Sequence, residues 1–284
     1  MIIKCPQCSA QRPSIVKYGN YYRTSDSRWV TRYRCKLCKK HFSNATFSPC
    51  YRQKKRRINF MILKLIGSKV SERRIALILG LSRKTVDRKI RFLGPQCKIK
   101  NYNWLKKQRI QFFQFDDLET HEHSKLKPLT VTSCVNEDYK IIGFSVARSP
   151  AKGHLAKRAV KKYGFRKNES LRARENLFKK LQPFVSKGVI VQSDQHPHYP
   201  DLVKKYFPGC EHETYKSKRS CVTGQGELKR AKFDPIFKIN HTMAMKRDNI
   251  GRLVRRSWCT TKKIEKLQDI LEIYMYFHNH YLKA

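Results

Sequence analysis

Acidic residues are scarce in this sequence. Its 284 residues include 21 Asp and Glu but 63 Lys and Arg, which gives a formal net charge of +42. A charge of this size opposes compact folding unless a polyanion is near. We therefore expect nucleic acid as the partner, with an anionic membrane surface or a ribosome-like assembly as the alternatives.

Long apolar runs are also missing. No run approaches the roughly 20 residues that a transmembrane helix needs, and the first residues lack the charged and apolar regions of a signal peptide. Internal repeats and low-complexity tracts are absent as well. Ten cysteines, four of them in metal-type spacing, fit a reducing compartment better than an oxidising one. These features predict a cytoplasmic protein.

Four of the ten cysteines stand in two CxxC motifs. Each motif places two thiolates on one side of a tight turn, and two such turns complete a tetrahedral site of the kind that holds structural Zn²⁺. Two disulfides or four idle thiols are the alternatives. Short strands are predicted between the motifs, at 16–23 and 28–34, so residues 1–50 are interpreted as a zinc ribbon. The predicted zinc ligands are Cys5, Cys8, Cys35 and Cys38.

Residues 56–94 have the period of helices and form a predicted helix-turn-helix. Ser71 and Ser82 are suitable N-caps, and Gly80 supplies the left-handed residue that ends the first helix. The second helix would lie in the major groove of DNA; a plain helical hairpin with a solvated basic surface is the alternative. The residues predicted to contact DNA from this helix are Arg83, Lys84, Arg88 and Arg91.

The rest of the chain is predicted to be a linker, 95–109, followed by an α/β domain, 110–284. Apolar strand patterns occur at 111–116, 129–135, 139–146 and 188–193, with helices at 171–181 and 199–206 and two late helices near 242–256 and 262–281. Strands first and then alternating helices and strands predict a sheet flanked by helices.

Two of these strands are predicted to end in acids, Asp116 and Asp194. A carboxylate at the end of a buried strand is costly unless it is paired or bound to a cation. If the two strands are neighbours, both acids can hold a pair of Mg²⁺ or Mn²⁺ ions about 3.5–4 Å apart, which suits phosphoryl transfer. The alternative is that both acids form turns or cap the next segment.

At this point the chain resembles a known family. A four-cysteine ribbon, a helix-turn-helix and a domain with these acids, in that order, are similar to bacterial insertion-sequence transposases of the insertion sequence one type and their relatives. The most specific stretches are the ribbon and residues 114–117, 192–195 and 249–257. The resemblance implies an RNase H-like mixed sheet with flanking helices. It also implies an Asp, Asp, Glu triad with an arginine seven residues after the glutamate.

Asp116 and Asp194 match the two aspartates of that triad, and Arg247 matches the arginine. The position of the glutamate holds Asn240, whose carbonyl oxygen binds Mg²⁺ more weakly than a carboxylate does. Three readings stay open here: Asn240 completes the site, the site has decayed, or another acid supplies the charge. The candidate substitutes are Asp248 and Glu227 for the third acid and Asp117 for Asp116.

The resemblance implies a transposase that cuts and joins the ends of an insertion sequence by metal-dependent phosphoryl transfer. Its partners would be double-stranded DNA, both element ends and target, in a homodimer or higher oligomer near the bacterial nucleoid. Two rivals remain: a DNA-binding regulator with an inert third domain, and an RNase H-type nuclease that cuts without joining. Four further basic residues near Arg247 are predicted to follow the DNA backbone, with a solvated surface as the alternative: Lys246, Arg252, Arg255 and Arg256.

Overall fold

The computed structural model describes residues 3–24, 27–216, 234–254 and 259–282. The chain divides into two compact units, Met1–Ile62 and Leu63–Ala284. The second unit is a mixed α/β structure, as predicted. None of the helices in the described parts combines the length and hydropathy of a transmembrane span.

The first unit contains a small antiparallel sheet of strand order β1-β2-β3. β1 is Ile15–Arg23, β2 is Arg28–Cys35 and β3 is His41–Ser43, and the 3-10 helix η1 follows at Asn44–Phe47. Its buried core is small, with Ile15, Tyr33 and Phe42 packed against Cys5 and Cys35. A core of so few apolar side chains does not stabilise a fold of this size by itself. The unit therefore needs a further stabilising element, such as a bound metal or a covalent cross-link.

Three helices follow: α1 (Ile58–Gly67), α2 (Glu72–Ile78) and α3 (Arg83–Leu105). Both predicted caps are confirmed, because the Ser71 hydroxyl accepts from the backbone N–H of Arg74 and the Ser82 hydroxyl accepts from that of Thr85. Gly80 has a φ of +57° in the turn between α2 and α3. Val86, Ile90 and Leu93 form the buried side of α3.

The predicted linker at 95–109 is wrong over most of its length, because α3 continues through Pro95 to Leu105. Tertiary contacts explain the difference. α3 packs along α9 (Ile264–Tyr281), and Asn101 donates from Nδ2 to the backbone oxygen of Glu272 at 3.0 Å and to its Oε2 at 2.8 Å. The partner helix stabilises a polar segment that is not predicted to be helical on its own.

The second unit is built on a five-stranded sheet of order β6-β5-β4-β7-β8. β4 (Ile110–His121), β5 (Pro128–Asn136) and β6 (Ile141–Arg148) are antiparallel neighbours, whereas β7 (Val185–Asp194) and β8 (Glu211–Tyr215) run parallel to β4. The four predicted strands of this sheet are confirmed. β3 and β8 were not predicted, because β3 is short and β8, Glu-His-Glu-Thr-Tyr, is polar.

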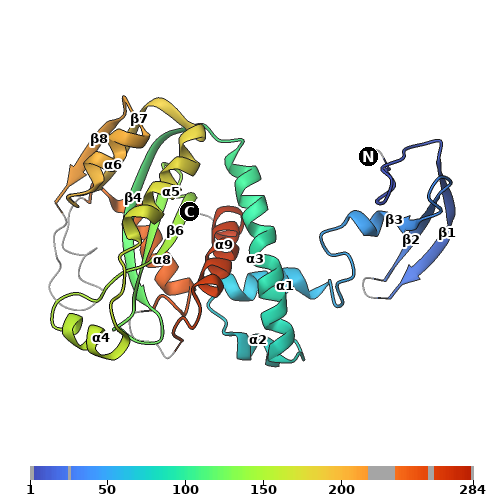
Figure 1. Ribbon diagram of the computed structural model, residues 1–284, viewed down its shortest axis with the longest axis horizontal. Coiled ribbons are helices and arrows are strands. Elements are labelled where there is room, and N and C mark those ends of the chain that lie inside the picture. Colours follow the sequence, from blue (N-terminus) through green and yellow to red (C-terminus); the bar gives the residue numbers. More distant parts are fainter. Residues whose placement is uncertain (1–2, 25–26, 217–233, 255–258, 283–284) are drawn as a thin grey trace. The chain divides into compact units, whose positions relative to one another are not determined.

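Helices cover both faces of this sheet (Figure 1). α5 (Ser170–Leu181) and α6 (Tyr199–Tyr206) enclose a core that contains Phe113, Phe115 and Phe178. α8 (Phe237–Asn249) contacts β4 and β5, and it begins and ends earlier than the helix predicted at 242–256. α9 lies between α3 and the sheet in Figure 1 and contacts both α3 and β6. The remaining elements are α4 (Leu155–Tyr163), which was not predicted, and η2 (Gln182–Phe184).

The contact between α3 and α9 joins the predicted helix-turn-helix to the sheet within one compact unit. Lys266 on α9 pairs with Asp87 on α3, and two turns further along α3 Gly94 faces Asp269. A Cβ added at Gly94 would lie 2.6 Å from the Asp269 Cγ and 2.7 Å from its Cβ. The helices are therefore close enough here that only glycine fits.

We expect Gly94→Ala to destabilise the second unit by about 1–3 kcal/mol, because the added methyl group must displace α9. Urea unfolding followed by circular dichroism measures this change. Lys98→Ala, at an exposed position of the same helix, is the matched control and should change the free energy of unfolding by less than about 0.5 kcal/mol. Equal effects of the two substitutions would contradict the close contact.

Candidate functional site

The four predicted zinc ligands lie together. The sulfur atoms of Cys5, Cys8, Cys35 and Cys38 are all within 4.8 Å of one another. The closest sulfur pairs are Cys5 with Cys38 at 3.4 Å and Cys8 with Cys35 at 3.6 Å. Each pair joins one CxxC motif to the other, so the cluster is consistent with a structural Zn²⁺ site.

The two motifs have the same local geometry. The residue after the second cysteine is left-handed in both, Ser9 with a φ of +58° and Lys39 with a φ of +60°. The chain then turns back, so that the backbone N–H of Cys5 donates to the Ala10 carbonyl at 2.8 Å and that of Cys35 to the Lys40 carbonyl at 2.9 Å. These turns hold the sulfurs on one side of the backbone before any metal binds.

Backbone N–H groups favour the thiolate form that zinc requires at two of the four cysteines. Burial raises the pKa of Cys5, but N–H groups of Cys8 and Gln7, together with the thiols of Cys38 and Cys8, outweigh it and lower the pKa to about 6. At Cys38 the Lys40 N–H acts in the same direction, but burial and the other three thiols outweigh it and raise the pKa to about 12. The backbone N–H of Cys38 is the main cause of a lowered pKa at Cys35. Metal binding is easier where less work is needed to remove the proton.

We expect Cys35→Ser to remove bound zinc and unfold the first unit, because its core depends on the cluster. Zinc content, measured by metal release to a chromogenic chelator, and the NMR signals of β1 and β2 check this. Cys50→Ser is the matched control, since Cys50 lies outside the cluster and its sulfur accepts from Asn59 at 3.6 Å. Full zinc content in Cys35→Ser would contradict the site.

A second cluster lies in the α/β unit, where β4 and β7 are neighbouring parallel strands. Gln114 is directly opposite Gln192, and Asp116 and Asp194 each lie two residues further along their strands. Because side chains alternate along a strand, the two acids are on the same face of the sheet as the two glutamines. The structure thus brings the two predicted acids together.

One detail of the prediction is wrong. Asp194 ends β7, but β4 continues past Asp116 to His121. The extension is held by β5, which pairs with β4 as far as His121 opposite Pro128. Asp116 therefore lies within a continuous strand, opposite Ser133 of β5. Asp194 is the last residue of β7.

Both carboxyl groups are partly buried and destabilised as anions. Burial, and then the charge of Asp194, raise the pKa of Asp116 to about 7, although Arg247 acts in the opposite direction. Burial also raises the pKa of Asp194, while His196 opposes the rise. The buried Oδ1 of Asp194 has no hydrogen-bond partner among the described residues. Two acids in this state are suited to a divalent cation, which would relieve their repulsion.

Helix α8 lies against this face through Gln114. The Gln114 side chain accepts from the backbone N–H of Ile239 at 2.9 Å and donates to the Pro235 carbonyl at 2.9 Å. Asn240 follows Ile239, and its Nδ2 donates to Asp234 Oδ2 at 2.8 Å. The amide nitrogen of Asn240 is therefore occupied, which leaves its oxygen as the atom that can accept a cation. Arg247, two turns later, is near enough to Asp116 to lower its pKa.

Asp234 was not identified from the sequence. It lies before α8, and its other oxygen accepts from the backbone N–H of Ile236 at 3.1 Å. An Asp-Pro pair before a helix is a signal for such a turn.

Glu213 was also missed, because β8 was not predicted. Its Oε2 accepts from Gln192 Nε2 and from the Tyr215 hydroxyl, both at 2.6 Å, and so continues the polar row of Gln114 and Gln192.

The proposed substitutes for the acids have other roles. Asp117 accepts from Thr132 at 2.5 Å and from the buried Arg174 at 3.1 Å, and as the neighbour of Asp116 on one strand its side chain starts from the opposite face. It still raises the pKa of Asp194. Asp248 is exposed and pairs with Lys69 at 3.4 Å. Glu227 lies outside the described residues.

The basic residues predicted to bind DNA divide into three groups. Arg83, Lys84, Arg88 and Arg91 on α3 are exposed, as that prediction requires. Lys246 does not lie on the surface: it is 1% exposed, and its Nζ donates to the Ser133 hydroxyl at 2.5 Å. Arg252 is mostly buried and pairs with Glu72 at 2.8 Å. Arg255 and Arg256 lie outside the described residues.

Lys246 and Arg252 are thus removed from the predicted DNA contacts, and the physical reason is packing. Lys246 points into the layer between α8 and the sheet, where burial lowers its pKa to about 7. Arg252 joins the end of α8 to the start of α2. Both were placed on the surface because lysine and arginine usually are.

No protein-family model matches the sequence, and no curated protein matches it significantly.

The raised pKa of Asp116 has a measurable effect on stability. An unfolded aspartate has a pKa near 3.9, so in metal-free protein this group stabilises the native state at low pH, and the contribution is lost as pH rises towards about 7. Asp116→Asn removes this penalty. We expect its stability relative to wild type to improve by about 2–3 kcal/mol between pH 5 and pH 8, measured by urea unfolding of the zinc-loaded protein in buffer without Mg²⁺ or Mn²⁺.

Asp201→Asn, at an exposed position of α6, is the control, and its stability relative to wild type should not depend on pH in this way. If both variants gave the same pH profile, Asp116 would not be the buried acid described above.

Proposed function

We propose that this chain is a DNA transposase, which cuts and joins the ends of an insertion sequence by metal-dependent phosphoryl transfer. The observation that carries the proposal is the placement of Asp116 and Asp194 on neighbouring parallel strands, with Arg247 of α8 acting on the first acid. Isolated strand-end acids are common, but two on neighbouring strands, of which one raises the pKa of the other beside a basic helix, are typical of a catalytic site.

The order of the chain supports the same reading. The chain contains, in this order, a four-cysteine cluster, a capped helix pair with an exposed basic surface and a mixed sheet. The transposases that the sequence resembles have the same order. A sheet of three antiparallel strands continued by two parallel ones, with helices on both faces, is in keeping with an RNase H-like domain.

Asp116, Asp194 and the amide oxygen of Asn240 would hold the metal ions. Mg²⁺ or Mn²⁺ bound there would lower the pKa of an attacking water or 3′-hydroxyl and stabilise the leaving oxygen. Asp234 orients the Asn240 amide through its hydrogen bond, so that the oxygen is presented rather than the nitrogen. Arg247 adds a fixed positive charge that can hold a phosphate or balance Asp116.

The DNA-binding surface would be the first half of α3. Arg83 and Lys84 at its start are best placed for base edges, and Arg88 and Arg91 for phosphates. The ribbon offers a second basic surface with exposed aromatic rings, since Trp29 is 71% exposed and Tyr22 50%. Joining two element ends requires both to be held at once, so we expect a homodimer or a larger assembly on DNA.

One observation favours a second candidate, a DNA-binding regulator whose third domain is inactive. The third acid of the triad is replaced by Asn240, and a neutral ligand leaves the metal site with less negative charge. The regulator would bind DNA without Mg²⁺ and cut nothing, whereas a nuclease would cut without joining.

We expect purified protein with Mg²⁺ or Mn²⁺ to nick a duplex that carries the DNA flanking its coding region, and to join the freed 3′ end to a target plasmid. Asp194→Asn should reduce cutting to background because it removes a metal ligand, while leaving duplex binding unchanged. Gel assays of cutting and joining, with fluorescence anisotropy for binding, measure the two properties separately.

Asp201→Asn is again the matched control and should keep both properties. If Asp194→Asn still cuts DNA, Asp194 is not a ligand of the catalytic metal. Binding without cutting in wild type would favour the regulator, and cutting without joining would favour the nuclease.

A further inference from the structure

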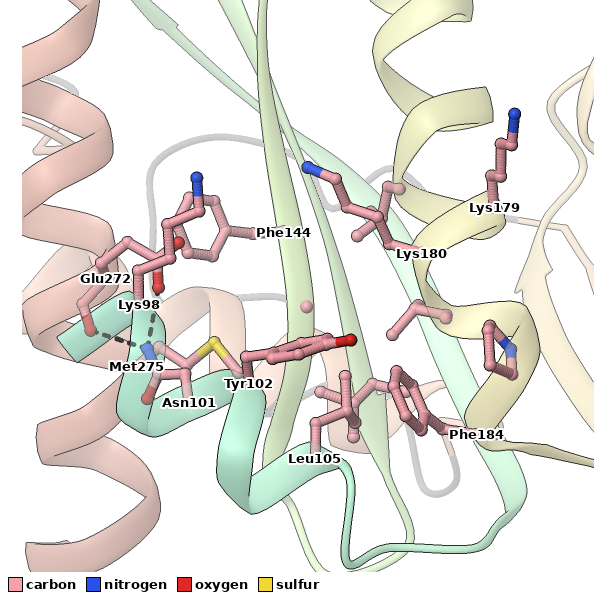
Figure 2. A pocket seen from close by; sticks show the side chains of 15 residues that line it. Lys98, Asn101, Tyr102, Leu105, Phe144, Lys179, Lys180, Phe184, Glu272 and Met275 are labelled. Atoms are coloured by element: carbon pink, nitrogen blue, oxygen red, sulfur yellow. Dashed lines mark hydrogen bonds between the residues drawn. The ribbon is translucent and has the colours of Figure 1, made fainter. Parts of the chain in front are cut away.

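A cavity lies away from the paired acids, between α3, α5, α9 and the edge strand β6. Its volume is about 490 Å³, within the range of small-ligand sites. Aromatic and aliphatic side chains from all these elements form its walls, with Tyr102, Leu105, Phe144, Phe184 and Met275 among them (Figure 2). Tyr102 is 49% exposed and meets Phe184 edge to face, with ring centroids 5.9 Å apart.

Three lysines surround this apolar surface. Lys98 comes from α3, and Lys179 and Lys180 come from α5. All three are exposed, and in Figure 2 their amines lie on one side of the Tyr102 ring. The rim is therefore positively charged, in a chain whose net charge is already +42. A ligand that has an aromatic or apolar ring with a negatively charged group attached next to it fits this arrangement.

A buried amide braces one wall of the cavity. Asn101 lines the cavity and is 4% exposed. Its nitrogen donates to two oxygens of Glu272, the backbone oxygen at 3.0 Å and Oε2 at 2.8 Å (dashed lines in Figure 2). Since both partners are acceptors, the orientation of the amide is fixed. Its Oδ1 is buried as well, so a molecule in the cavity does not reach it.

We propose that this cavity holds an unstacked nucleobase of single-stranded DNA, with the flanking phosphates on Lys98, Lys179 and Lys180. Two features of a nucleotide have a counterpart: Tyr102 and Phe184 offer an aromatic surface against which a base can stack, and the three lysines offer positive charge to the phosphates. Aromatic platforms beside cationic side chains are the usual means of binding single strands.

This inference rests on the proposed function only in taking DNA as the partner. A site for one unstacked base would hold in place a DNA strand that has separated from its complement. The cavity is separate from the acids, so binding here needs no divalent metal.

The test uses the full chain with its zinc, in buffer without Mg²⁺ or Mn²⁺. The ligand is a fluorescein-labelled single-stranded oligonucleotide of 12 nucleotides, together with a series in which one base at a time is replaced by an abasic site. In wild type, an abasic site at the bound position should weaken binding about tenfold. Tyr102→Ala should weaken binding of the intact strand to the same extent and become insensitive to that abasic site. Anisotropy gives each Kd.

Two further variants show that stacking is responsible. Tyr102→Phe keeps the ring and should behave like wild type. Tyr163→Ala, on α4, is the matched control: its ring is 41% exposed and also lies beside lysines, with Lys127 at 4.3 Å from the ring centroid, and its loss should leave the abasic response unchanged.

Three results would overturn the proposal. The first is that no abasic site weakens binding to the wild-type protein. The second is that the abasic site weakens binding to Tyr102→Ala as much as binding to wild type. The third is binding to phosphatidylglycerol vesicles that depends on Tyr102, without any effect of abasic sites, which would make the cavity a lipid site. A labelled duplex in the same assay separates this failure from that of the proposed function: duplex binding that persists leaves DNA as the partner and removes only the nucleobase site.

Discussion

The parallel pairing of β4 with β7 is the constraint on which the candidate site of this protein depends. It sets two carboxyl groups on the same face of the sheet in a chain that has few of them. Their mutual repulsion and partial burial raise the pKa of Asp116 to about 7, so the fold carries a local electrostatic cost. Such costs persist where the surrounding structure enforces them, and they are concentrated at functional sites. Here the enforcing parts are the polar row of Gln114 and Gln192 and the helix α8 that it anchors.

The second organising feature is the contact between α3 and α9. The predicted DNA-reading helix is part of the same compact unit as the sheet. It is held there by a close approach at Gly94 and by polar contacts on either side, Asp87 with Lys266 and Asn101 with Glu272. The first unit has a different basis, since its small core is completed by four thiols rather than by apolar volume.

Much of this could be predicted from short-range patterns. The CxxC spacing, the serine caps and the alternation of β4 and β7 are local, and a local signal needs no knowledge of the fold. The predictions that failed concern residues whose structure depends on contacts with distant parts of the chain. Residues 95–105 became helical because α9 supports them, and Lys246 is buried where Ser133, 113 residues away, accepts a hydrogen bond from it. β8 is polar and pairs only because β7 provides an edge. Asp234 and Asn101 were missed because neither stands in a motif; their roles follow from the hydrogen bonds that each makes.

The length of α3 has a geometric consequence. From Arg83 to Tyr102 the helix rises about 28 Å at 1.5 Å per residue, which equals roughly eight base pairs of duplex at 3.4 Å each. The groove-reading end and the aromatic cavity are thus two points on one rod, braced along its side by α9. If both hold the same DNA, the chain measures a span: the first unpaired nucleotide would be accepted only at a set number of steps from the sequence being read.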